Sequence, residues 1–312
     1  MRHLLGPRTQ PLAAPPARST ALLVALLAAS VLLTGCAAGN PTGESPGDRE
    51  DPEEGASLDE AADTDLVVGA AADLRPAFED LGEQLTDQTG IDVAFVFGSS
   101  GQLAQQAIEG APVDVYASAN VDYVEAVLDS GRGDPDSQQT YAQGRIVIWT
   151  RAEADQHWTD LHELADAEAG AEPLAIANPE HAPYGRAAQE ALASTGVWDE
   201  AQPRLVYGEN IADTHRLAAS GNADAAITAL SLALAADLDA SASASEAGAW
   251  TLIDAEAHEP LQQDLVVTAE DPARAERAAA FVDLVGSDEG RATMRDYGFL
   301  LPGEDPPPAW EE

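Results

Sequence analysis

Four segments of the chain share one pattern, in which a short apolar strand is followed by a turn of small residues and the start of a helix. Near-continuous apolar strands are typical of sheets that are covered on both faces. Regular alternation of strand and helix predicts an α/β fold. The four expected strands span residues 66–72, 93–97, 174–178 and 205–207.

The turns at the ends of these strands have a chemical meaning. The first N–H groups of a helix have no intrahelical partner, and the helix dipole adds partial positive charge there. A helix start can therefore bind an anion without Lys or Arg, and Gly and Ser allow an oxyanion to approach closely. The turns lie at residue 73 and at 98–101, 182–185 and 208–211, before expected helices at 74–85, 102–108, 186–194 and 212–220.

The pattern by itself leaves two interpretations open. The four turns are either the ordinary strand–helix connections of any α/β fold, or helix starts from two distant parts of the chain that converge on one small anion. The pattern alone favours the first interpretation.

The charge of the chain excludes several classes of partner. The 312 residues contain 55 acidic residues and 15 basic ones, all of them Arg, which gives a formal net charge of −40. Such a field repels phosphate backbones and anionic lipid, so neither nucleic acid nor a peripheral membrane surface is an expected partner. An apolar content of 45% is sufficient for a sizeable core.

The first residues have the form of a signal peptide. Three Arg precede an apolar run at 21–33, which is too short to span a membrane comfortably. The run ends in Leu33, Thr34, Gly35 and Cys36, which resembles the lipobox of bacterial lipoproteins. We therefore expect residues 1–35 to be removed and Cys36 to carry a lipid anchor; the alternative is a signal peptide followed by an incidental cysteine.

Residues 36–63 are rich in Gly, Pro, Ser, Asp and Glu and contain almost no large apolar side chains. Such a stretch buries too little surface to offset its ordering entropy. We predict a disordered acidic tether here and a disordered tail at 303–312, so the folded body is expected at about 64–302.

Several segments together resemble the periplasmic molybdate-binding proteins of ABC importers, in the order and spacing of that family. They are Ala-Ala-Ala-Asp-Leu at 70–74, Phe-Gly-Ser-Ser-Gly-Gln-Leu-Ala at 97–104, Gly-Ala-Pro-Val-Asp-Val-Tyr-Ala-Ser-Ala at 110–119, Ile-Ala-Asn-Pro-Glu-His-Ala-Pro-Tyr-Gly at 176–185, Gly-Glu-Asn-Ile at 208–211 and Arg-Asp-Tyr-Gly-Phe at 295–299.

The resemblance implies the α/β fold of type II periplasmic binding proteins, with two lobes, a two-strand hinge and a ligand cleft between the lobes. Lobe 1 is expected at 64–147 and 262–302, and lobe 2 at 148–261. It also implies an extracytoplasmic lipoprotein, anchored to the outer face of the cell membrane, that delivers molybdate or tungstate to an ABC permease. No cofactor is implied, and a monomer is the default for this scaffold.

The resemblance assigns the ligand contacts residue by residue. Its main positions are Asp73, Ser100, Tyr184 and Ile211, with Tyr184 and Ile211 acting through their backbone N–H groups and Ser100 through its hydroxyl and N–H. Secondary candidates are Ser99, Gly101, Ala119 and Ala229. Ala229 stands where some members carry a Tyr that closes the pocket, so one donor is missing here or is supplied elsewhere.

Asp73 departs from the family, which has Ser or Asn at this position. A carboxylate within about 4 Å of a dianion costs several kcal/mol in a partly buried site. Asp73 is therefore expected to cap its own helix, with which Pro76 in the first turn is compatible. The alternative is that Asp73 accepts a proton from a protonated oxyanion such as hydrogen phosphate, which would change the substrate.

Enzymatic functions are poorly supported. Gly98 and Gly101 flank Ser100 without the Gly-x-Ser-x-Gly spacing of a nucleophile elbow. The six His residues form no His-Glu-x-x-His motif, so no catalytic residue and no free-cation site is expected. His181 lies near the expected cleft but is interpreted as a turn residue.

Three hypotheses remain from the sequence. The first is a binding lipoprotein for molybdate or tungstate, and the second is a binder of another oxyanion, such as phosphate or sulfate, on the same scaffold. The third is an interaction or enzymatic domain that has lost oxyanion binding, which Asp73 and Ala229 keep open.

Overall fold

A computed structural model describes residues 61, 64–154, 157–165, 173–238 and 248–304. The expected signal peptide, the lipidated Cys36, nearly all of the tether and most of the tail lie outside the described residues. Within the described residues, no helix combines the length and the apolar character needed to cross a membrane.

The first lobe is built on a five-stranded mixed sheet. Its strand order is β2-β1-β3-β10-β4, in which β1, β2 and β3 are parallel and β10 is antiparallel to both β3 and β4. The chain therefore leaves this sheet after β4 and returns with β10, which lies between β3 and β4. The strands are β1 Leu66–Ala71, β2 Val93–Gly98, β3 Val115–Ser118, β4 Gln139–Gly144 and β10 Leu261–Val267.

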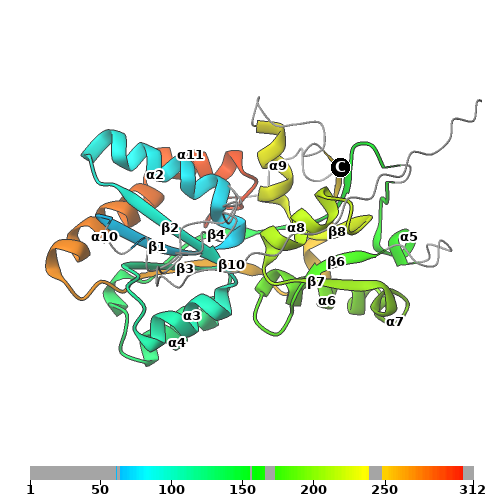
Figure 1. The fold of residues 1–312 in the computed structure, drawn as a ribbon, viewed down its shortest axis with the longest axis horizontal. Coiled ribbons are helices and arrows are strands. Elements are labelled where there is room, and N and C mark those ends of the chain that lie inside the picture. The colour runs from blue at the N-terminus through cyan, green and yellow to red at the C-terminus, as the bar shows by residue number, and fades with distance from the viewer. Residues whose placement is uncertain (1–60, 62–63, 155–156, 166–172, 239–247, 305–312) are drawn as a thin grey trace, which may run out of the picture. The chain divides into compact units, whose positions relative to one another are not determined.

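Helices cover both faces of this sheet (Figure 1). One face carries the core around Phe78 and Phe281, whose rings meet edge to face at 5.3 Å, and the other carries Tyr116 and Val266. The helices on the first face are α2 Arg75–Thr89, α10 Pro272–Gly286 and α11 Asp288–Asp296, and those on the second are α3 Ser100–Glu109 and α4 Val121–Asp129.

The second lobe repeats this arrangement on another mixed sheet. The strand order is β7-β6-β8-β5-β9, with β6 parallel to β7 and β8, and β5 antiparallel to β8 and β9. The strands are β5 Ile146–Arg151, β6 Leu174–Ala177, β7 Leu205–Gly208, β8 Ala225–Ala229 and β9 Gly248–Leu252.

Strand β5 shows why this second sheet is apolar on both sides. Successive side chains of a strand point to opposite faces. Ile146 and Ile148 therefore join the core beneath α6, whereas Val147 and Trp149 join a separate core with α8 and α9. The remaining elements are α5 Leu161–Ala165, α6 Pro183–Ser194, α7 Trp198–Ala201, α8 Ile211–Ala219, α9 Leu230–Leu238 and the short turns η1 Ala72–Leu74, η2 Pro135–Ser137, η3 Gln202–Arg204 and η4 Ala255–Ala257.

The predicted α/β fold with two lobes is confirmed, and the four expected strands become β1, β2, β6 and β7. Burial on both faces holds for β1 and β6, which are fully buried. It does not hold for β2 and β7, which are half-buried along most of their length. The reason is their position, because both are edge strands of their sheets.

The chain passes between the two sheets at two places that lie close together. The first passage is Arg145, between β4 and β5, and the second is the stretch from Leu252 to Leu261. The Nη2 of Arg145 donates to the carbonyl of Ile253 at 3.4 Å, which links the passages. Strand β5 begins two residues before the expected start of lobe 2 at 148.

Candidate functional site

Four helix starts face the junction of the two lobes. In the first lobe, β1 runs into η1, and β2 runs into α3 with Ser99 as its N-cap. In the second lobe, β6 leads to α6 with Ala182 as N-cap, and β7 leads to α8 with Asn210 as N-cap. Each start leaves its first N–H groups without an intrahelical partner.

Asp73 in η1 is fully buried, with an exposed fraction of 0%. Its Oδ2 accepts hydrogen bonds from the hydroxyl of Tyr184 at 2.9 Å and from Nε2 of Gln263 at 2.7 Å. Its Oδ1 is buried and has no hydrogen-bond partner among the described residues. One carboxylate thus joins a helix of the second lobe to a strand of the first.

Burial raises the pKa of Asp73 from 3.8 to about 6, although the hydrogen bonds from Tyr184, Gln263 and its own backbone N–H oppose the shift. Desolvation disfavours the charged form of a carboxyl, so the pKa rises until hydrogen bonds to the carboxylate compensate. The Asp73 carboxyl of this site therefore has a pKa of about 6, well above that of an ordinary Asp.

The expected capping role of Asp73 is wrong. Neither η1 nor α2 receives a hydrogen bond from a capping side chain, and the N-cap positions are Ala71 and Leu74. The physical reason is that Tyr184 and Gln263 offer an O–H and an N–H to the same carboxylate oxygen from outside the helix.

Tyr184 contributes its side chain as well as its place at the start of α6. The ring is buried, and burial together with the nearby charge of Asp73 raises the pKa of the Tyr184 hydroxyl well above its usual value. Room for the phenol comes from Gly144, where a Cβ would lie 2.0 Å from Tyr184 Oη. The sequence prediction assigned this residue only a backbone contact.

His181 joins the lobes at a second point. Its carbonyl accepts from the Ser99 hydroxyl at 2.5 Å and from the Gly101 N–H at 3.0 Å. The Nδ1 of His181 lies 2.8 Å from Ser99 Oγ, and since that hydroxyl proton goes to the carbonyl, Nδ1 must carry the proton of this contact. The interpretation of His181 as a simple turn residue is thus incomplete.

The Ser100 hydroxyl is positioned by an N–H donor, which leaves its own proton free to be donated to a ligand. Its Oγ accepts from the backbone N–H of Ala119 at 3.1 Å, and its carbonyl accepts from the Tyr116 hydroxyl at 2.7 Å. Ser100 and Ala119 are both buried. An Oγ that accepts from an N–H still has an O–H to donate, which suits an anionic ligand.

Ile211 and Ala229 occupy less polar parts of the site. Ile211 is the first residue of α8 and is buried, while the side chain of Asn210 accepts the N–H of Asp213 at 2.9 Å. Ala229 ends β8 and is also buried, and two residues later the hydroxyl of Ser231 donates to the carbonyl of Asp73 at 2.7 Å.

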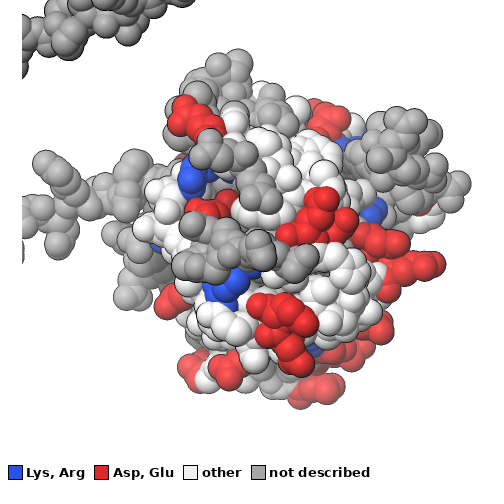
Figure 2. Space-filling view, turned by 90° about the vertical axis from the view of Figure 1, so that its right-hand side faces the viewer, with Lys and Arg blue, Asp and Glu red and all other residues white. Residues whose placement is uncertain are grey.

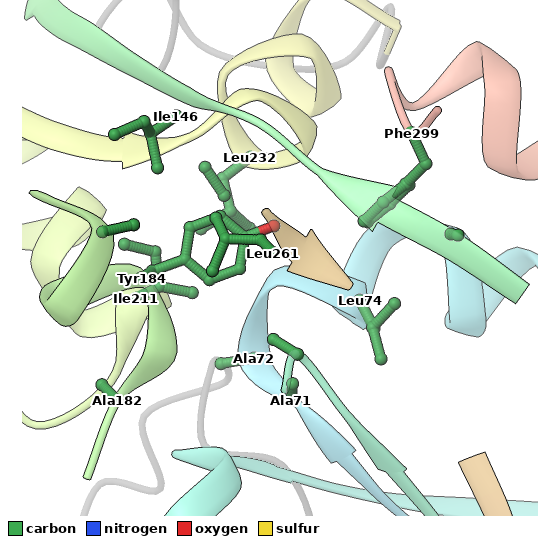
Figure 3. Close-up of a cluster of buried hydrophobic side chains, with 14 of the residues drawn as sticks. Ala71, Ala72, Leu74, Ile146, Ala182, Tyr184, Ile211, Leu232, Leu261 and Phe299 are labelled. Carbon is green, nitrogen blue, oxygen red and sulfur yellow. The ribbon is translucent and has the colours of Figure 1, made fainter. Parts of the chain in front are cut away.

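The structure brings the four main predicted positions together. Tyr184 contacts Asp73 directly, and η1 packs against α8 and α9. Figure 3 shows Tyr184 and Ile211 in the apolar cluster that also holds Ala71 and Ala72. Ser100 joins the group because its neighbours Ser99 and Gly101 bond to the loop before α6.

A cavity of about 360 Å³ lies beside this junction. It is lined by the start of α4, by Pro183 and Arg186 of α6, and by residues 259–262 before and at the start of β10. Its charged side chains are Asp122, Glu190 and Glu259 against Arg186, so an anion is disfavoured there and the four helix starts remain the candidate site. No group of three or more His, Cys, Asp or Glu suited to a metal ion occurs in the described part of the chain.

The comparisons with known proteins identify the family of this chain. Residues 66–300 match the family described as bacterial extracellular solute-binding protein. The chain is 32% identical over 243 residues to the molybdate-binding protein ModA of Rhodobacter capsulatus, covering 77% of this chain and 90% of that protein. The chain belongs to the bacterial extracellular solute-binding protein family.

One further sequence relative and one solved structure are also similar to this solute-binding protein. It is 25% identical over 279 residues to the putative ABC transporter substrate-binding lipoprotein YvgL of Bacillus subtilis, covering 89% of this chain and 96% of that protein. The periplasmic molybdate-binding protein of Azotobacter vinelandii has a TM-score of 0.67 at 30% identity, over 76% of this chain and 99% of that chain.

Gln263 is the site residue that the sequence analysis missed in this solute-binding protein. It is fully buried in β10 and is followed by Asp264, which is also buried. Two buried polar residues in a strand whose other buried residues are apolar are a signal of a buried hydrogen-bond network. The partner of Gln263 was not deducible from that signal, because Asp73 lies 190 residues earlier in the chain.

Proposed function

We propose that this protein captures molybdate or tungstate outside the cytoplasm and delivers it to the permease of an ABC importer. The N–H groups at the starts of α3, α6, α8 and η1, together with the Ser100 hydroxyl, bind the oxyanion. The observation that carries the proposal is that helix starts of both lobes meet at Asp73–Tyr184 and at Ser99–His181. The identity of the proposed ligand is taken from the two relatives that are named as molybdate-binding proteins.

Neutral donors explain how so acidic a chain binds an anion. Helix N-termini bind oxyanions through N–H groups and the helix dipole, neither of which depends on the net charge of the surface. The Ser100 hydroxyl adds a donor that its contact with the Ala119 N–H leaves free. The site binds the oxyanion intact and performs no chemistry on it.

The lobes close around the ligand by a hinge movement. Arg145 and the stretch 253–260 are the two connections that turn, and the contacts of Tyr184 and His181 with the first lobe form on closure. The permease recognises this closed conformation of the binding protein.

Size selectivity follows from fixed donors. A smaller oxyanion such as sulfate leaves some of the N–H groups unpaired, and each unpaired buried donor costs about 1–3 kcal/mol. Molybdate and tungstate are nearly equal in size and charge, so the same donors serve both.

We also propose that Cys36 carries a lipid that anchors the protein to the outer face of the cell membrane, with the acidic residues up to 63 as a tether and a monomer as the working form. The basis is the sequence of residues 33–36 and the likeness to a putative lipoprotein over 89% of the chain.

A second candidate ligand is an oxyanion that carries its own proton, such as hydrogen phosphate. The buried Oδ1 of Asp73, which has no partner among the described residues, favours this candidate because it is an acceptor. A hydroxyl of the ligand would satisfy it.

Thermal unfolding of the protein with each oxyanion tests these proposals. A ligand present at 100 times its Kd stabilises the fold by about 2.7 kcal/mol. Molybdate and tungstate are expected to raise the Tm at concentrations where sulfate and phosphate do not. A shift with phosphate alone would favour the second candidate, and no shift with any oxyanion would refute oxyanion binding.

A further inference from the structure

The two carboxylate oxygens of Asp73 differ in their hydrogen-bond partners. Oδ2 accepts two hydrogen bonds, from Tyr184 and from Gln263, while Oδ1 is equally buried and has none among the described residues. A buried polar atom without a partner destabilises the folded state. An arrangement that satisfies one oxygen twice and leaves the other unused indicates that the second oxygen has a partner from outside the chain.

The hydrogen bonds around Asp73 favour one oxygen as the place for a proton. The amide of Gln263 presents its NH₂ group to the carboxylate, which can only accept when ionised, and its Oε1 accepts from the hydroxyl of Tyr141 at 3.3 Å. Oδ2 therefore faces two donors, Nε2 of Gln263 and the hydroxyl of Tyr184. A proton on Oδ1 leaves both of these hydrogen bonds intact, whereas a proton on Oδ2 would displace them, so Oδ1 is the favoured position.

An ionised Oδ1 and a dianionic ligand are incompatible at close range. Two negative charges at about 4 Å repel by several kcal/mol at the dielectric of a partly buried site. Protonation of Oδ1 turns this repulsion into an attraction, because the O–H group then donates a hydrogen bond to an oxygen of the oxyanion. One proton between Oδ1 and the ligand is sufficient, whichever of the two it belongs to.

We propose that this site takes up one proton with each oxyanion that it binds, and that the proton lies between Oδ1 of Asp73 and the ligand. The inference rests on the proposed function and adds the identity of the group that makes binding depend on pH. Asp73 then acts as a hydrogen-bond donor to the ligand through Oδ1.

No charged group among the described residues competes for this role. Tyr184 of α6 and Tyr141 of β4 are the titratable side chains nearest to Asp73, and burial raises the pKa of both hydroxyls well above their usual value. Arg75 of α2 turns instead to Glu79 at 3.4 Å and to the ring of Phe97.

The other elements that pack against η1 present uncharged groups to it. From α9, Ser231 donates to the carbonyl of Asp73, and from α8, Ile211 joins the same apolar cluster as Ala72. With its pKa at about 6 in these buried surroundings, the Asp73 carboxyl is mostly ionised at neutral pH, and a less buried carboxyl before closure is ionised more completely still. The proton of the complex is therefore drawn from solvent.

Calorimetry in two buffers of different ionisation enthalpy measures this proton directly. Molybdate titrated into the full chain near pH 7.5 is expected to take up about one proton per site. The Kd should rise by up to about tenfold per pH unit above neutral pH and level off at lower pH, once the carboxyl of the unliganded protein already carries its proton.

Two variants assign the proton to Asp73. Asp73→Asn keeps an acceptor for Tyr184 and Gln263 and places an NH₂ at Oδ1, so it should bind molybdate without proton uptake and without the pH dependence. Asp264→Asn is the matched control, because Asp264 is buried in the same region of β10 but has partners for both oxygens, from Gln138 and Thr140. It should keep the proton uptake of the natural protein.

The outcomes separate this inference from the function on which it rests. Molybdate binding by the natural protein with no proton uptake overturns the inference and leaves the function standing. Uptake that persists in Asp73→Asn, or disappears in Asp264→Asn, also overturns it. No binding of molybdate at any pH overturns the proposed function itself. If Asp73→Asn does not fold, the proton uptake of the natural protein and the pH dependence of its Kd still test the inference.

Discussion

The hydroxyl of Tyr184 donates a hydrogen bond of 2.9 Å to the carboxylate of Asp73, although the two residues belong to different lobes. Asp73 follows the first strand of one sheet, and Tyr184 lies at the start of a helix on the other. In the proposed function, closure of the two lobes completes the surroundings of this buried acid, so that ligand capture is linked to the protonation state of Asp73.

Replacing Tyr184 with Phe tests this bond between the lobes. The variant keeps the ring but removes the hydroxyl, so Asp73 Oδ2 retains only Gln263. A lost hydrogen bond to a charged group costs about 1.5–3 kcal/mol, which predicts roughly a 10- to 150-fold rise in the Kd for molybdate. Calorimetry measures it, with Tyr207→Phe, an exposed Tyr in β7, as the control. An unchanged Kd would show that the bond does not stabilise the closed form.

Ser100→Ala tests the hydroxyl that is proposed to donate to the ligand. The variant should lose about 1–3 kcal/mol of binding free energy. It also leaves the buried N–H of Ala119 without its acceptor, so the unliganded protein should unfold at a lower temperature. Comparing thermal unfolding with and without molybdate separates the two effects. A lower Tm with unchanged affinity would remove the Ser100 hydroxyl from the ligand contacts.

The sequence was sufficient for the local parts of this fold. Short apolar runs and turns of small residues depend on neighbours in the chain, so β1, β2, β6 and β7 and the starts of α3 and α8 lie within about one or two residues of the expected places. The start of α6 was expected at 186 but lies at Pro183, since proline is well accommodated in the first turn of a helix.

The sequence was not sufficient for the contacts between distant segments. Tyr184 and Gln263 lie 111 and 190 residues from Asp73, and no local pattern specifies which hydrogen-bond donors reach a buried carboxylate. The capping role assigned to Asp73 was the best local alternative, and it is wrong because nonlocal donors compete with the helix N–H groups. His181 was likewise assigned a turn, since its partner Ser99 is 82 residues away.

The raised pKa of Asp73 predicts how stability depends on pH. The folded protein binds this proton more tightly than the unfolded chain, whose Asp titrates near 3.8. The carboxyl therefore costs nothing at low pH, becomes destabilising as pH rises from 3.8 to about 6, and has a constant effect above that range. The total is about 3 kcal/mol.

Asp73→Asn isolates this contribution from that of the other carboxyls. Its free energy of unfolding, relative to that of the natural protein, should rise by up to about 3 kcal/mol between pH 4 and pH 7. Urea unfolding at several pH values measures the difference. A difference that is independent of pH would mean that Asp73 is not a buried acid in solution.

Gly144→Ala should displace the Tyr184 hydroxyl while leaving the Tyr184 side chain itself unchanged. A Cβ at this position would lie 2.0 Å from Tyr184 Oη, and such overpacking costs about 1–3 kcal/mol. The effect on affinity should overlap with that of Tyr184→Phe, so the double variant should lose less than both single losses added. Gly286→Ala is the control, because its Cβ would meet only the flexible end of Gln139. Full additivity would contradict the shared contact.

The acidic surface predicts an unusual salt dependence of ligand association. The proposed removal of residues 1–35, which contain three Arg and no acidic residue, would change the net charge from −40 to −43. On the side of the second lobe, carboxylates outnumber Arg among the described surface residues (Figure 2). Salt screens repulsion between this field and a dianion, so stopped-flow association rates for molybdate should increase with ionic strength. A rate that falls with salt would indicate an Arg cluster that attracts the ligand.

The central claim is that helix starts of both lobes form a site for molybdate or tungstate, and calorimetric titration of the protein at fixed salt and pH tests it most directly. Molybdate and tungstate should each bind at one site with a Kd at or below about 1 μM, a free energy of at least about 8 kcal/mol in magnitude. Sulfate and phosphate should bind far more weakly. Tighter binding of phosphate or sulfate than of molybdate, or no heat with any of the four oxyanions, would contradict the account.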